Sequence, residues 1–184
     1  MPSLAIATLK SLSWYGQSKY YDTPAKEKKE SHADYEERTW RERCHYDEAG
    51  KIFIPAMCFK KALATAASFL GEKIPGKGNQ QYSKHFVAGV LVVESLPLPE
   101  TKDSMLRFPV MCSANGRSGG GSRVKKNFPY VTSWKGKVEF HVLDDVITEE
   151  VFTRTLIEAG SMIGVGYFRP ERGGYWGRFV VEKI

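Results

Sequence analysis

The segment GVGYFRPERGGYWGRF, at residues 164–179, holds the residue types best suited to binding a polyanion. Five glycines, three arginines and five aromatic residues stand together there. Bare glycine backbone and planar guanidinium groups bind oxyanions, and aromatic rings that do not pack in the core can stack on bases. The segment therefore predicts nucleic-acid contacts from Arg169, Arg172 and Arg178, in a loop built on Gly164, Gly166, Gly173, Gly174 and Gly177.

Two further basic stretches could contact phosphates. GEKIPGKG, at residues 71–78, is not a nucleotide-binding P-loop, because Gly78 stands where the motif needs Ser or Thr and because a predicted helix precedes it. NGRSGGGSRVKK, at residues 115–126, is mostly glycine, serine and positive charge, and it cannot pack a core. On an amphipathic helix, a lysine pair such as Lys60 and Lys61 is most often just a solvated face. With this pair included, the candidates are Lys60, Lys61, Lys77, Lys84, Arg117, Arg123, Lys125 and Lys126.

Catalytic and metal-binding patterns are weak by comparison. His32 precedes Asp34 and His45 precedes Asp47, but no nucleophile signature accompanies either pair. The three cysteines are widely separated and form no CxxC pair, so they predict neither a disulfide framework nor a zinc site. We expect no cofactor and no metal, and we expect binding rather than catalysis, with RNA cleavage left open.

Composition limits the class of protein. The chain has 184 residues, 42% hydrophobic content, a formal net charge of +6 and a pI near 9.2, which favour an anionic partner. Length favours a single domain over residues 1–184, with inserted loops at about 16–50 and 101–135. We find no secretory signal and no apolar run that could span a bilayer, so we expect a soluble, cytoplasmic protein without membrane contact.

The elements that must position these residues follow from hydrophobic spacing. We predict strands at residues 4–12, 51–55, 86–93, 138–142 and 178–183, and helices at 59–70, ending at Gly71, and after a Thr148 cap. Residues 26–48 are crowded with charge and predict a solvated insertion or mobile arm. With the short 51–55 run leading into the first helix, the core order is strand, helix, strand, strand, helix, strand. That order predicts an α+β, ferredoxin-like βαββαβ core with long inserted loops.

Two motifs resemble the RAMP superfamily of CRISPR-associated proteins, especially its backbone subunit. KIFIPAMCFKKAL, at residues 51–63, is similar to the family's strand-to-helix signature, with Ala56 and Met57 where Gly-Ser is usual. LIEAGSMIGVGYFRPERGGYWGRFVV, at 156–181, is similar to its second helix, glycine-rich loop and last strand, with Pro170 inserted. The resemblance implies an RNA-recognition-type core that grips a single strand by its backbone. It also implies a thumb-like loop at NGRSGGGSRVKK.

Our leading hypothesis is a non-catalytic, self-assembling subunit of a CRISPR-like ribonucleoprotein that binds guide-type, single-stranded RNA. Single-stranded DNA stays open as the ligand, because backbone gripping needs no 2′-hydroxyl group. Copies of the chain or CRISPR effector subunits would be its protein partners. One alternative is a phage-encoded subunit mimic that inserts into a CRISPR complex and inhibits it. The other alternative is an endoribonuclease of the same superfamily.

Overall fold

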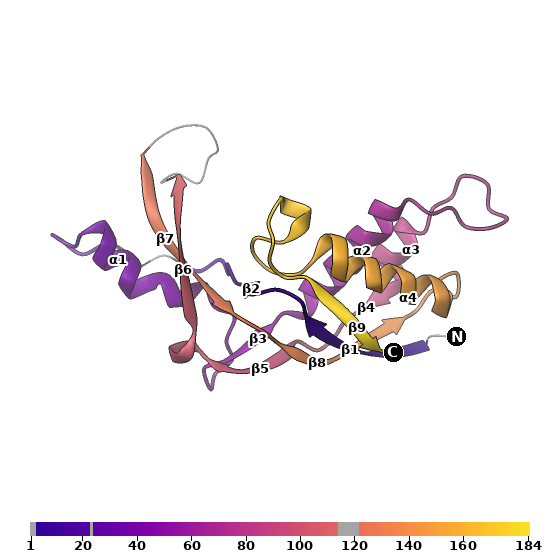
Figure 1. The fold of residues 1–184 in the computed structure, drawn as a ribbon, viewed down its shortest axis with the longest axis horizontal. Helices are drawn as coiled ribbons and strands as arrows, with labels where there is room; N and C mark the ends of the chain where they lie inside the picture. The colour runs from indigo at the N-terminus through magenta and orange to yellow at the C-terminus, as the bar shows by residue number, and fades with distance from the viewer. Residues whose placement is uncertain (1–2, 23, 114–121) are drawn as a thin grey trace.

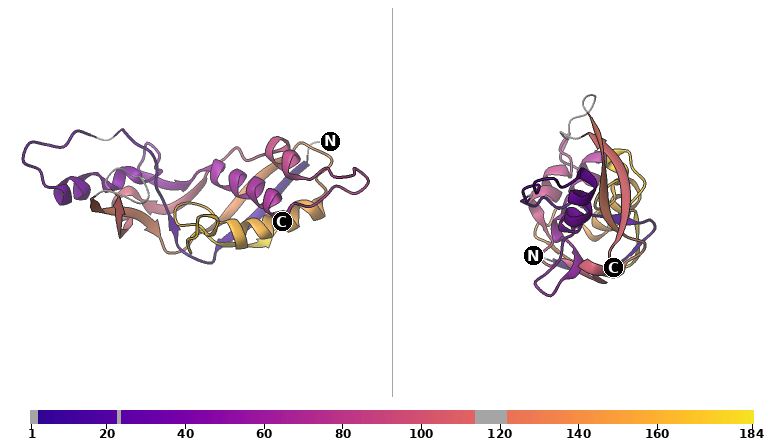
Figure 2. Two further views of the ribbon diagram at one scale, coloured as in Figure 1. Left: turned by 90° about the horizontal axis from the view of Figure 1, so that it is seen from above. Right: turned by 90° about the vertical axis from the view of Figure 1, so that its left-hand side faces the viewer.

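A four-stranded sheet with its helices forms one end of the molecule, and a β-hairpin with a short helix forms the other (Figure 1). The computed structural model describes residues 3–22, 24–113 and 122–184. Figure 2 shows that the hairpin and the short helix lie toward one end of the long axis. Within the described residues, no helix is long and apolar enough to cross a lipid bilayer.

The four-stranded sheet is antiparallel, in the order β4 (Val90–Leu91), β8 (Lys135–Val142), β1 (Ser3–Ser11), β9 (Phe179–Lys183). The predicted alternation of β8 is confirmed, because Val138, Phe140 and Val142 are all buried. The strands predicted at both ends of the chain are confirmed as β1 and β9. These strands form the floor on which the apolar core lies.

Three helices lie over one face of this sheet (Figure 1): α2 (Ala56–Leu70), α3 (Ser83–Gly89) and α4 (Glu149–Glu158). A π-helical turn, η3 (Ala159–Ile163), continues α4. Gly71 ends α2 with a φ of +61°, and the Thr148 side chain accepts a hydrogen bond from the Val151 amide, so both predicted helix boundaries are confirmed. Pro55 is the residue before the first turn of α2.

The remaining elements build the other end. Strand β7 (Arg123–Val131) pairs with β2 (Tyr15–Gly16) on one side and β6 (Leu106–Ser113) on the other, and β3 (Lys51–Ile54) pairs with β5 (Leu96–Thr101). Helix α1 (His32–Thr39) runs into a 3-10 turn, η1 (Trp40–Arg43). Two further 3-10 turns are η2 (Lys102–Ser104) and η4 (Pro170–Arg172). The predicted α+β class is confirmed.

The strand predicted at residues 86–93 is mostly wrong. Residues up to Gly89 belong to α3, and only Val90 and Leu91 form β4. Phe86 and Val90 are buried, whereas Val87 is 56% exposed, which is the spacing of a helical turn. A short apolar run suits a buried strand and a buried helix equally well, so its periodicity could not decide between them.

The two segments predicted as inserted loops are also more ordered than expected. Residues 26–48 hold α1 and η1, with Trp40 and Cys44 fully buried, so the prediction of a solvated arm is wrong for its second half. The predicted loop at residues 101–135 forms the β6–β7 hairpin over its described part. Of the NGRSGGGSRVKK segment, residues 123–126 belong to β7, and residues 115–121 lie outside the described residues.

A buried ion pair fixes α1 and η1 against β7. The Arg43 guanidinium donates to both carboxylate oxygens of Glu36, at 2.7 and 3.1 Å, and to the Asn127 carbonyl at 3.1 Å. The Asn127 amide in turn donates to Glu36 at 2.5 Å. These four hydrogen bonds join three residues. Burying a charge is costly unless it is paired and hydrogen-bonded, so Glu36 and Arg43 each need the other as a counter-ion.

Replacing Glu36 tests this dependence. Glu36→Gln keeps the shape of the side chain but leaves the Arg43 charge buried without a counter-ion, so we expect a loss of about 3–5 kcal/mol in the free energy of unfolding. The matched control is Glu37→Gln, on the exposed side of α1, where the loss of an ion pair with Arg107 should cost less than about 1 kcal/mol. Denaturant unfolding measures both, and equal losses would contradict the role of the buried pair.

Candidate nucleic-acid interface

The glycine-rich segment at residues 164–178, called the glycine loop here, is held together by its own backbone. The amides of Gly164, Gly173, Gly174 and Gly177 donate to the carbonyls of Ala159, Pro170, Arg169 and Trp14, at 2.6–3.1 Å. These four amides are therefore engaged within the fold, and they do not form the open phosphate cradle expected from the sequence. The loop's conformation is set before any ligand binds.

Close approach of the chain to itself explains why these positions are glycine. A Cβ atom at Gly174 would collide with the Phe168 carbonyl, and one at Gly177 would collide with the Val165 carbonyl. A Cβ at Gly166 would meet Gly16 and the Tyr15 ring. Gly177 also has a φ of +77°, which side-chain-bearing residues rarely adopt. The backbone comes close to protein here, where the sequence suggested that it would come close to a ligand.

A first hollow of about 460 Å³ lies where the two family-like motifs meet. The first motif contributes Cys58 and Lys61 from the start of α2, and the glycine loop contributes Gly166 and Arg169. The short strand β2, the residues after it as far as Ser18, and His45 also line the hollow. Segments more than a hundred residues apart thus form one concave surface that carries two cations.

The titratable groups of the first hollow favour binding over nucleophilic chemistry. Burial raises the pKa of the Cys58 thiol, which keeps it protonated and poorly nucleophilic. Burial, with the nearby Lys19 charge, lowers the pKa of His45, so its ring is neutral near pH 7. Among the described residues, no group of three or more His, Cys, Asp or Glu side chains is placed to hold a metal ion.

The three arginines of the glycine loop differ in their contacts. Arg169 pairs with Glu171 at 2.7 Å and donates to the Gly166 carbonyl at 3.0 Å. Arg178 donates to the carbonyls of Ser161 and Tyr175. Arg172 is 67% exposed, and its closest carboxylate oxygen, on Glu171, is 3.9 Å away. Two of the predicted arginines therefore stabilise the loop, and Arg172 is the one most open to solvent.

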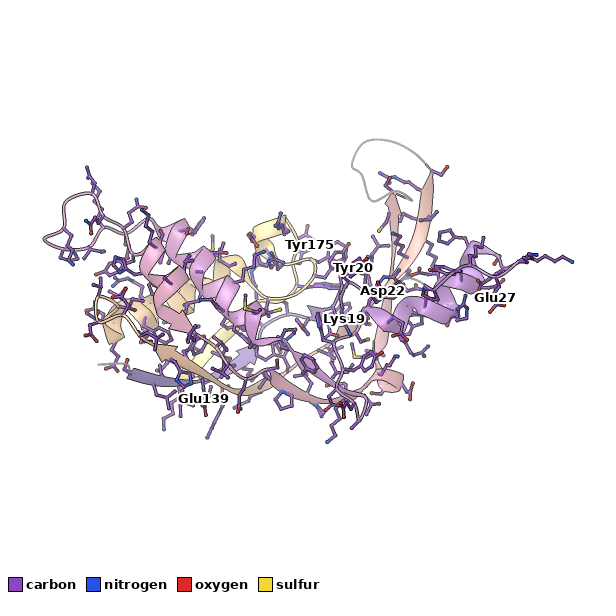
Figure 3. All side chains as sticks on the ribbon, turned by 180° about the vertical axis from the view of Figure 1, so that it is seen from behind. Lys19, Tyr20, Asp22, Glu27, Glu139 and Tyr175 are labelled. Carbon is purple, nitrogen blue, oxygen red and sulfur yellow. The ribbon has the colours of Figure 1, made fainter. Side chains whose placement is uncertain are left out.

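Two further hollows are linked to the first through shared lining residues. The second, of about 460 Å³, shares Ser18 with the first and is lined by Lys19, Tyr20, Tyr21, Tyr35, Arg43 and Lys126, among others. The third, of about 370 Å³, shares His32 and Glu36 with the second and adds Arg107, Arg123 and Lys125. Figure 3 shows Lys19, Tyr20 and Asp22 between the glycine loop, which carries Tyr175, and the α1 end of the molecule. We call these three adjoining hollows the basic track.

Positive charge predominates along the basic track. Its lining holds eight Lys or Arg side chains and three glutamates. The glutamates pair with Arg43, Arg107 and Arg169. In the part of the chain that the structure describes, the other five cations have no carboxylate within ion-pair distance: Lys19, Lys61, Arg123, Lys125 and Lys126. Four of those five were predicted from the sequence.

The remaining predicted cations lie elsewhere. Lys60 donates to the carbonyls of Val87 and Val90 at 2.8 and 2.6 Å, so it caps the end of α3 and is not free for phosphate. Lys77 and Lys84 are exposed in the loop before α3 and on α3 itself, away from the basic track. Arg117 lies outside the described residues. The structure therefore groups only part of the predicted set.

Sequence reasoning missed Lys19, His45 and Arg107 as lining residues. Lys19 stands in SWYGQSKYY, where two tyrosines follow a lysine directly, and this alternation of ring and charge was the available signal. His45 and Arg107 reach their hollows through pairing of distant segments, which no local pattern records. The distribution of charge along the sequence would not have distinguished Lys19 and Arg107 from the other cations.

A pair of glycine substitutions tests whether close packing sets the loop. Gly173 and Gly177 have nearly equal φ values, +76° and +77°, but only Gly177 faces backbone that a Cβ would strike. Gly173→Ala should cost about 1–2 kcal/mol in the free energy of unfolding, from the left-handed conformation. Gly177→Ala should cost a further ~1–3 kcal/mol from overpacking. Equal losses in denaturant unfolding would show that φ alone matters.

Comparison with known proteins finds similarity among solved structures. No protein-family model matches this chain, and no curated protein matches it. Among solved structures, the chain is similar to the crystal structure of Cmr6 from Pyrococcus furiosus, with a TM-score of 0.49 and 14% sequence identity. The likeness covers 98% of this chain and 99% of that chain.

Proposed function

We propose that this protein binds single-stranded RNA through the sugar–phosphate backbone along the basic track. The observation that carries the proposal is that five cations lining these three hollows have no carboxylate partner among the described residues. Grooves for single strands combine such charge with stacking surfaces, and tyrosines line the second hollow. Because backbone contacts need no 2′-hydroxyl group, single-stranded DNA should bind as well.

We also propose that residues 1–184 form one RAMP-like domain on a ferredoxin-like core. Strand β1, helix α2, strands β4 and β8, helix α4 and strand β9 follow one another in the required order, and the sheet order β4-β8-β1-β9 is antiparallel throughout. One buried cluster includes Trp40 and Tyr15 together with sheet residues such as Phe140, which supports a single domain. The two family-like motifs line the same hollow, which supports the resemblance.

Salt dependence of binding provides the test. For single strands, log affinity falls against log salt with a slope of about −0.7 per neutralised phosphate. A variant with Lys61→Gln, Lys125→Gln and Lys126→Gln should therefore lose roughly 2 from the magnitude of this slope. The control makes the same charge change off the track, with Lys77→Gln, Lys84→Gln and Lys137→Gln. Filter binding of a uridine and a thymidine oligonucleotide measures both variants, and equal slopes would overturn the assignment of the track.

The RNA recovered from the same titration separates binding from cleavage. Intact RNA on a denaturing gel, with and without magnesium, is the expected result for a non-catalytic protein. Shortened RNA would support the endoribonuclease alternative. His45 would then be the first residue to replace, because its neutral ring lines the first hollow.

Self-assembly on RNA is the further part of the proposed function. The β6–β7 hairpin stands out from the body in Figure 1, at the position where the resemblance implies a thumb-like element between neighbouring subunits. We expect the purified protein to form a large species with strong absorbance at 260 nm that shrinks after ribonuclease treatment. A monomer free of nucleic acid, which copurifies with effector subunits instead, would support the mimic alternative.

A further inference from the structure

Aromatic rings from three separate segments meet beside the glycine loop. Trp14 stacks on Tyr130, with ring centroids 4.6 Å apart and planes 20° from parallel. The centroid of the Trp176 ring lies 5.6 Å from the centroids of both these rings. It lies 5.1 Å from the centroid of Phe108, in an edge-to-face arrangement. We call these four residues the aromatic surface: Trp14, Phe108, Tyr130 and Trp176.

Backbone contacts hold these rings in place. The Gly177 amide donates to the Trp14 carbonyl at 2.6 Å, which fixes Trp14 to the glycine loop. Tyr130 and Phe108 are held by the β6–β7 register, in which Leu106 pairs with Tyr130 and Phe108 with Phe128. A Cβ at Gly16 would lie 2.8 Å from the Trp176 ring, so this glycine makes room for the indole. The surface is therefore assembled before any ligand arrives.

The aromatic surface is more exposed than the apolar core. Trp14 is 39% exposed and Phe108 38%, whereas the other two tryptophans of the chain, Trp40 and Trp134, are at most 4% exposed. Exposed rings forgo part of the stabilisation that burial would give. Contiguous apolar rings left in water mark binding sites on soluble proteins.

Position along the hairpin points to the occupant. Residues two apart on a strand share a face, so Tyr130 lies on the same face of β7 as Phe128 and Lys126. Lys126 lines the second hollow of the basic track. Arg123 and Lys125, in the third hollow, lie on the opposite face of β7. A strand whose phosphates follow the first two hollows therefore has its bases on the face of the hairpin that carries the rings. Arg172, on the same glycine loop as Trp176, adds an exposed positive charge.

We propose that the aromatic surface stacks on unpaired bases of the strand whose backbone lies in the basic track. The inference rests on the proposed function, and it adds a base-contacting site to a backbone-binding one. Every base offers a π-face, so stacking increases affinity with little dependence on sequence. Loss of one stacked base should weaken binding by roughly 5- to 100-fold.

Tryptophan fluorescence distinguishes stacking from phosphate contact. Titration with a uridine oligonucleotide should quench the emission of Trp14 and Trp176, since the other two tryptophans are buried. An abasic oligoribonucleotide with the same number of phosphates should bind more weakly, by at least about fivefold, and should not quench. This comparison uses the unaltered protein, so it does not depend on the folding of any variant.

Two variants place the effect on the aromatic surface. Trp14→Leu should remove most of the quenching and reduce affinity for the uridine oligonucleotide to that for the abasic one. Phe108→Leu, on the edge strand β6, provides a second variant if Trp14→Leu does not fold. Phe69→Leu, which removes a 59% exposed ring from α2, is the matched control and should bind like the unaltered protein.

The outcomes separate this inference from the proposed function. Equal affinity for the two oligonucleotides without quenching would overturn the stacking site and leave backbone binding intact. Failure of both to bind would overturn both proposals. Self-association that Trp14→Leu abolishes, with base binding unchanged, would assign the surface to a second copy of the chain and overturn the inference.

Discussion

The buried contact among Glu36, Arg43 and Asn127 is the constraint on which the far end of the molecule depends. It joins a helix, a 3-10 turn and a hairpin strand that lie as much as 91 residues apart. The same residues line the second and third hollows, with Glu36 in both. The shape of the basic track therefore depends on the ion pair between Glu36 and Arg43, whose opposite charges cancel. Because the Glu36 carboxylate pairs with Arg43, it does not serve as a counter-ion for Arg123, Lys125 or Lys126.

The glycine loop has the corresponding role at the other end of the track. Its glycines allow backbone segments to pass at distances that a Cβ would forbid, and the packed loop places Arg169 in the lining of the same hollow as Lys61. Different residues thus set the conformation of the glycine loop and the positions of the cations in the first hollow. Glycine provides the close approach, and the helix start at α2 provides the second cation. Nucleic acid would contact the cations that this packing positions, rather than the glycine amides themselves.

Much of the core could be predicted because its signals are local. The alternation in β8, the Gly71 end of α2 and the Thr148 cap each depend on a few neighbouring residues, and each is found as expected. The 86–93 run was misassigned because an apolar octamer lacks the polar positions that separate a helical from a strand period. The order of the charged 26–48 segment could not be predicted from its composition. Arg43 is buried only because it pairs with Glu36 on α1 and with the Asn127 carbonyl on β7. The charge pattern of the sequence identifies candidate residues of the basic track. Only the pairing of distant segments in the fold determines where each residue lies along it.

The edges of the two larger sheets limit how copies of this chain can associate. Strand β4, at one edge of the four-stranded sheet, is two residues long, and β6, at the edge of the hairpin sheet, carries Pro109 in its middle. A proline cannot donate to a neighbouring strand, and two residues give little backbone to pair with. Continuous sheets running from copy to copy are disfavoured at these two edges, which leaves β9 as the edge strand of the four-stranded sheet with more backbone to pair. A filament joined at the β4 or β6 edge would depend on side chains and on a shared strand of nucleic acid, which would make its length a property of the ligand.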